Sequence, residues 1–181
     1  GGVRYLGGTC ETYGNINASD SLYVIKKLVF EEKKISLPEL IRATNRNFEG
    51  YELLRKQCIS VEKYGNDCKP VDDMANDLYE FVAKGIRDRG IRAGMQYYLI
   101  VISNNSLNSE WGVRTGCSPD GRLAGMFMNP ANNPQGGADR NGPTALLNSL
   151  SRFDAKYHAG SVQNIKFSTG MFLDNKLLMK T

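Results

Sequence analysis

Histidine and closely spaced cysteines are scarce in this sequence. Its 181 residues include one histidine, His158, and four cysteines, at positions 10, 58, 68 and 117. No two cysteines are separated by only two residues, which excludes the usual zinc-ribbon and thioredoxin spacings. Without a recognisable secretory leader we expect reduced thiols. His158 lies in a polar stretch, so we expect it at the surface rather than in the role of a general base.

Long apolar runs are also missing. The longest covers residues 97–102, far below the ~18 residues that a bilayer span requires. No basic segment followed by an apolar one opens the chain, so we expect no signal peptide, no membrane contact and a cytoplasmic location. The net charge of +4 is spread along the sequence. We therefore expect no nucleic-acid partner.

Several catalytic signatures are absent as well. The sequence has no glycine-rich phosphate loop, no Gly-x-Gly-x-x-Gly and no Gly-x-Ser-x-Gly elbow. Cys10 precedes Glu11, but a neighbouring carboxylate raises a thiol pKa rather than activating it. We therefore interpret Cys10 as structural. Cys58 falls on an apolar helix face and is expected in the core.

The elements that are present indicate a helix-rich α/β chain. Hydrophobic residues make up 41% and charged residues 23% of the sequence, which is typical of a globular domain or a piece of one. Apolar periodicity predicts helices at 19–32, 37–44, 51–61, 71–86 (ended by Gly90), 144–153 and 172–179. Ser36 to Glu39 forms a capping box, and Thr144 is the expected N-cap of its helix. Strands are predicted at 95–102, buried on both faces, and at 162–168.

A long stretch between the two strands lacks regular patterning. Residues 103–143 contain seven glycines and four prolines. Loops of this length are usually functional or disordered, and the apolar Trp111, Phe127 and Met128 favour an ordered functional loop. Asp120, between Pro119 and Gly121, is typical of turn chemistry. These local patterns alone predict an α/β segment with a long ordered loop, and they indicate no particular reaction.

Several short motifs together resemble a known family, the glycyl radical enzymes of the pyruvate formate-lyase superfamily. The matching pieces follow the family's order: Gly1–Tyr5, Ala18–Leu22, Phe48–Tyr51, Lys63–Asp67, Thr115–Arg122 and Gly137–Ala145. The Gly-Pro-Thr-Ala form at 142–145 is closest to the diol dehydratase and lyase branch. Each motif is weak alone, but their ordered succession is specific.

The resemblance implies a fold, a chemistry and partners. The family fold is a ten-stranded α/β barrel, and this chain would be a part of it. The family's chemistry passes from a stored glycyl radical to a cysteine thiyl radical, which takes a hydrogen atom from a small polar substrate. The segment itself would bind no cofactor, because a separate radical-SAM iron–sulfur activase installs the radical. Its other expected partners are the remainder of the barrel, the glycyl radical domain and further copies of the protein.

The departures from the family pattern are as informative as the matches. The sequence contains no Arg-Val-x-Gly-Tyr radical motif. Cys10 and Cys117 do not fall where the family's radical cysteine lies, so neither receives that role. We therefore expect residues 1–181 to form a single segment, the C-terminal half of the barrel domain, without the glycyl radical domain and without either radical loop.

Ser103 and Asn104 are the candidate substrate-binding residues. They follow the strand at 95–102, where the family strand ends in Ser-Asn and lines the substrate cavity. The alternative is that these polar residues only end the strand. The predicted function is that of a segment of an anaerobic dehydratase, lyase or formate acetyltransferase-like enzyme, inactive alone. The competing hypothesis is a non-catalytic remnant or interaction module.

Overall fold

A three-stranded parallel sheet forms one side of the molecule. The computed structural model describes residues 2–102, 106–167 and 170. Within them, β1 (Gly7–Glu11), β2 (Tyr97–Ile102) and β3 (His158–Ser161) lie in the order β1-β2-β3. Both pairings are parallel, with Gly7 beside Tyr97 and Ile102 beside Ser161. Parallel neighbours require crossover connections, and the long helical segments of this chain supply them.

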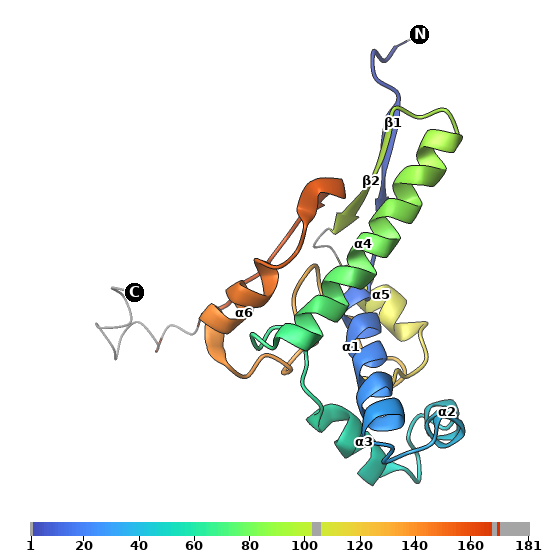
Figure 1. Ribbon diagram of the computed structural model, residues 1–181, viewed down its shortest axis with the longest axis vertical. Helices are drawn as coiled ribbons and strands as arrows, with labels where there is room; N and C mark the ends of the chain where they lie inside the picture. The colour runs from blue at the N-terminus through green and yellow to red at the C-terminus, as the bar shows by residue number, and fades with distance from the viewer. Residues whose placement is uncertain (1, 103–105, 168–169, 171–181) are drawn as a thin grey trace.

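Helices make up most of the rest of the molecule, and Figure 1 shows α4 running alongside β1 and β2 with α1, α2 and α3 toward the opposite end. Their bounds are α1 (Asn15–Ile25), a π-helix (Lys26–Glu31), α2 (Leu37–Asn45), α3 (Glu52–Ser60), α4 (Lys69–Arg92), α5 (Leu107–Val113), α6 (Gly142–Leu150) and a 3-10 turn (Ala155–Tyr157). The helix-rich α/β class is as predicted.

The early helices follow the sequence pattern closely. The helix expected from residue 19 begins at Asn15, after Gly14 with φ 70°, and continues as a π-helix in which the Glu32 N–H reaches the Lys27 carbonyl at 2.8 Å. The predicted cap at Ser36 is confirmed, because its hydroxyl accepts from the Glu39 N–H at 3.3 Å.

Gly90 does not end α4, contrary to the sequence prediction. The helix continues to Arg92, and Gly90 is buried against β2. A Cβ atom at this position would lie 2.1 Å from the Cβ of Tyr98. The glycine is therefore required by close approach of helix and strand, and the left-handed Gly94 (φ 84°) follows the helix end instead.

The two faces of the sheet differ, so the prediction of burial on both faces is wrong within the described residues. Tyr98, Ile100 and Ile102 alternate onto the side that α4 covers, and Ile100 and Ile102 are buried. The opposite side is less covered, as Tyr97 is 43% exposed. We call this second side the open face; it carries Thr9, Glu11, Tyr97, Leu99 and Val101.

The second half of the chain departs most from prediction. The stretch 103–143 contains α5, which packs its Gly112 against the backbone of Met126 and Phe127. The strand expected at 162–168 lies earlier, at β3, and residues 162–167 are not in a strand. Asn141, not Thr144, is the N-cap of α6. The helix predicted at 172–179 lies outside the described residues.

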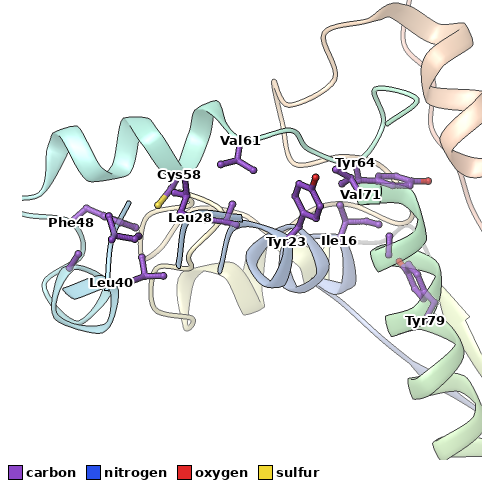
Figure 2. Close-up of a cluster of buried hydrophobic side chains, with 14 of the residues drawn as sticks. Ile16, Tyr23, Leu28, Leu40, Phe48, Cys58, Val61, Tyr64, Val71 and Tyr79 are labelled. Atoms are coloured by element: carbon purple, nitrogen blue, oxygen red, sulfur yellow. The ribbon is translucent and has the colours of Figure 1, made fainter. Parts of the chain in front are cut away.

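One apolar core joins the helices and reaches the sheet. Figure 2 shows it extending from Phe48 and Leu40, past Leu28 and Cys58, to Tyr64 and Tyr79. Cys58 is fully buried, which confirms its predicted place in the core. Phe153 closes the far end, with its ring 4.6 Å from that of Tyr79 in an edge-on arrangement. This core holds the functional segments at fixed positions.

Candidate functional site

Asn17 links the start of α1 to the long irregular segment. Its side-chain amide donates to Asp120 Oδ2 at 2.7 Å and to Gln135 Oε1 at 3.0 Å. It also exchanges hydrogen bonds with Asn129, whose N–H donates to Asn17 Oδ1 at 2.8 Å. All of these bonds join residues more than one hundred positions apart in the sequence, so they fix the loop to the helix.

Asp120 confirms the predicted turn and adds a role that sequence reasoning missed. The Gly121 N–H closes the turn on the Ser118 carbonyl at 2.9 Å, and Gly121 adopts φ 100°. Asp120 is 5% exposed. Its carboxylate accepts from the Ser118 hydroxyl, from the Arg122 N–H and from Asn17. Both carboxylate oxygens therefore accept hydrogen bonds that stabilise the loop.

Arg122 is a buried cation whose terminal nitrogens are hydrogen-bonded. It is 4% exposed, and its guanidinium donates to the carbonyls of Met126 at 2.8 Å, Leu123 at 3.2 Å and Gly116. A buried charge needs such partners to offset lost hydration. The guanidinium thus shapes the loop from the inside.

Asp20 lies one turn after Asn17 and is completely buried. Its Oδ1 accepts the Tyr64 N–H at 3.0 Å, whereas Oδ2 has no hydrogen-bond partner among the described residues. Burial raises the pKa of this carboxyl to about 7, and the Tyr64 N–H and the charge of Lys63 act in the opposite direction. Asp20 is therefore a proton-binding group near neutrality.

Lys63, which directly precedes Tyr64 in the sequence, is a buried cation. Its ammonium donates to the carbonyls of Cys58 and Val61, each at 2.7 Å. These carbonyls lie at the C-terminal end of α3, where helix carbonyls lack intrahelical partners. Burial lowers the Lys63 pKa. The ammonium thus caps α3 and makes no hydrogen bond to Asp20.

Asn66 joins the 63–67 loop to the segment before α6. Its side-chain amide donates to the Ala138 carbonyl at 2.8 Å, and its Oδ1 accepts the Arg140 N–H at 2.7 Å. Nearby, Arg152 pairs with Asp67 at 2.6 Å and Asp72 at 3.2 Å. Four of the six family-like motifs, at 18–22, 63–67, 115–122 and 137–145, therefore meet in space.

A polar cavity of about 310 Å³ lies where these motifs meet. Its wall includes Asp20, Arg55, Lys63, Asp120 and Arg140. It combines residues of α1, α3, the 118–122 turn and the 135–141 segment. The volume is at the lower end of the range for small-molecule pockets.

The carboxyl edge of the sheet is a second place where polar residues gather. The predicted substrate-binding residues, Ser103 and Asn104, follow β2 in the sequence but lie outside the described residues. At the same edge, the buried Asn132 contacts Ser161 at the end of β3, and its N–H donates to the Val162 carbonyl at 3.1 Å. Carboxyl edges of parallel strands are common ligand positions.

His158 is not the surface residue that the sequence suggested. It lies half-buried in β3, with its ring 5.8 Å from that of Tyr79, and burial lowers its pKa. All four cysteines are free thiols. Among the described residues, no group of three or more His, Cys, Asp or Glu side chains is placed to hold a metal ion, and no helix there could cross a membrane.

Comparison with known proteins settles the family. The pyruvate formate lyase-like family model matches residues 1–108. The chain belongs to this family. The glycine radical family model matches residues 128–179, so the polar cavity draws its wall from both matched regions.

Individual relatives agree with this membership. The chain is 30% identical to a trans-4-hydroxy-L-proline dehydratase of Clostridioides difficile, over 97% of this chain and 22% of the relative. It is 33% identical to an isethionate sulfite-lyase of Bilophila wadsworthia, over 82% of this chain and 18% of the relative. A glycerol-bound, B12-independent glycerol dehydratase of Clostridium butyricum superposes with a TM-score of 0.84 at 29% identity, over 99% of this chain and 24% of that structure.

These comparisons confirm the glycyl radical enzyme resemblance and the barrel fold class. The chain spans about a fifth of the length of the relatives it matches. The sequence signal that could have located the polar cavity is the pair Asn17 and Asp20, since polar residues there interrupt an otherwise apolar helix face containing Ile16, Tyr23 and Val24.

Proposed function

We propose that the protein takes part in a glycyl radical dehydration or lyase reaction on a small polar molecule. The observation that carries the proposal is the family match over residues 1–108, combined with a parallel sheet whose second face is open. The named relatives that dehydrate hydroxyproline or cleave isethionate support the same reaction class. The substrate itself is proposed only as a small hydroxylated or anionic molecule.

In this proposal the sheet supplies one wall of the substrate chamber. The open face would line the chamber. At the edge of that wall, the Ser103 hydroxyl and the Asn104 amide would hydrogen-bond the substrate. A glycyl radical, when present, supplies hydrogen-atom abstraction through a thiyl radical. The sequence has no Arg-Val-x-Gly-Tyr motif, so no glycine of this chain is assigned the radical.

The domain arrangement is proposed to differ from a single barrel segment. The second family match supports a chain that passes from the barrel region into the start of the glycine radical region between residues 108 and 128. The proposed partners are the rest of the barrel, a radical-SAM activase with an iron–sulfur cluster, the small substrate and a second copy of the protein, in an anaerobic cytoplasm.

Electron paramagnetic resonance of the complete gene product tests the reaction class. After anaerobic treatment with a competent activase, we expect the doublet of a glycyl radical, and we expect its loss on exposure to oxygen. Absence of the doublet, while a known dehydratase treated in parallel gives it, would contradict the proposal. That result would favour the non-catalytic remnant instead.

Substitution of Ser103 and Asn104 tests whether these residues hydrogen-bond the substrate. Ser103→Ala and Asn104→Ala each remove one hydrogen-bonding group, so we expect the KM to rise by about tenfold with the radical yield unchanged. Steady-state kinetics on the activated protein measures the effect, with the exposed Ser109→Ala on α5 as the matched control. An unchanged KM in both variants would leave the two residues as strand terminators.

A further inference from the structure

Asp20, in the wall of the polar cavity, has a carboxylate oxygen that the described residues leave without a hydrogen bond. Asp20 is completely buried, its Oδ1 accepts the Tyr64 N–H, and its Oδ2 has no hydrogen-bond partner in the part of the chain that the structure describes. An unsatisfied buried polar atom costs about 1–3 kcal/mol, and more when it is charged. The expected partner is a donor that occupies the cavity.

The buried charged groups of this network already have partners of their own. Lys63 donates to the carbonyls of Cys58 and Val61 at the end of α3. The Arg122 guanidinium donates to loop carbonyls, and Asp120 has its own donors. The cavity therefore keeps one available buried acceptor after its internal network is complete.

Two guanidinium groups in the same cavity wall are available to bind a negatively charged group of a ligand. Arg55 uses its Nε to donate to the Gly121 carbonyl at 2.9 Å. Within the described residues, its terminal nitrogens and the whole Arg140 side chain have no hydrogen bond or ion pair, although both residues line the cavity. Guanidinium groups bind carboxylates with two parallel hydrogen bonds.

We propose that the polar cavity binds a small amphoteric molecule of the amino-acid class, with its ammonium group on Asp20 and its carboxylate on Arg55 and Arg140. The cavity volume of about 310 Å³ accommodates a ligand of this size. Because the polar cavity draws on both family matches, a bound ligand would stabilise the junction between them.

Calorimetric titration of the protein with L-serine tests the proposal, with ethanolamine and glycolate as probes that carry only one of the two charges. We expect L-serine to bind and to raise the melting temperature. We expect Asp20→Asn and Arg140→Gln each to weaken its binding about tenfold or more. Arg42→Gln, which removes an exposed cation of α2 away from the cavity, is the matched control.

Three results would overturn the proposal. They are no heat of binding with L-serine, binding that both cavity variants leave unchanged, and a crystal structure with L-serine that shows only water beside Asp20. If Asp20→Asn fails to fold, the exposed Arg140→Gln decides. Ser103→Ala and Asn104→Ala should leave L-serine binding unchanged, and loss of binding in them would place the ligand at the substrate wall instead.

Discussion

At the residue scale, buried polar groups distinguish the motif region from an ordinary core. Asn17 and Asp120 satisfy each other across more than one hundred residues of sequence. Arg122 satisfies backbone carbonyls of its own loop. Asp20 differs from these, since one of its carboxylate oxygens, like the Tyr64 hydroxyl, lacks a partner among the described residues. Because burial changes the pKa of such a group on folding, the free energy of unfolding depends on pH.

Replacing Asp20 by asparagine should change the pH dependence of stability. An acid whose pKa rises from 3.8 when unfolded to about 7 when folded contributes stability below pH 4, and this contribution is lost as the pH rises toward 7. Asparagine resembles the protonated acid and keeps an oxygen for the Tyr64 N–H. Without ligand, we expect Asp20→Asn to be more stable than wild type at pH 8, by on the order of 1–3 kcal/mol.

Urea unfolding at pH 5 and pH 8 measures this effect. The difference between variant and wild type should shrink at pH 5, where the native carboxyl is protonated. Asp73→Asn, at a half-exposed position of α4, is the control and should show no comparable change between the two pH values. A constant difference across the range would mean that Asp20 does not titrate in this window.

At the scale of elements, the sequence predicts helices better than it predicts their ends. The early helices appear because their apolar spacing is strong and because Ser36 caps α2. The prediction that Gly90 ends the helix is wrong, because a glycine that ends a helix and a glycine that allows a strand to approach look the same in a sequence. Only the contact with Tyr98 distinguishes them.

A pair of glycine substitutions in α4 tests this interpretation. Gly90→Ala places a methyl group against Tyr98 and should destabilise the protein by about 1–3 kcal/mol, as overpacking does. Gly85→Ala meets only the flexible end of Arg89 at 3.0 Å, so its better helix propensity should stabilise by up to about 1 kcal/mol.

Thermal and urea unfolding of the two variants provides the measurement. Equal effects from both substitutions would show that helix propensity, rather than the approach of α4 to β2, governs position 90. A destabilising effect confined to Gly90→Ala would support the packing explanation.

At the scale of the whole molecule, the sheet formed by the described residues has an unpaired edge on each side. β1 and β3 are its outer strands, and the open face exposes Tyr97. Unpaired strand edges pair readily with other chains. In a barrel, neighbouring strands would cover both edges, which agrees with the likeness to glycyl radical enzyme structures.

The 181-residue chain, prepared without other polypeptide, should therefore self-associate. We expect its mass by light scattering to rise with concentration. Placing lysines at Leu99 and Val101, on the open face, should reduce association if that face is responsible. A monodisperse monomer at all concentrations would count against the interpretation as a piece of a barrel wall.

The sequence by itself determined the class, the main helices, the central strand and the family, because these depend on local periodicity and on short ordered motifs. Tertiary structure alone decided that four of those motifs surround one cavity and that β3 precedes its predicted position. It also decided that Asp120, besides forming a turn, is buried and accepts hydrogen bonds from Ser118, Arg122 and Asn17. The physical reason is that hydrogen bonds such as that from Asn17 to Asp120 join distant residues. Local spacing carries no record of which distant partner satisfies a polar group.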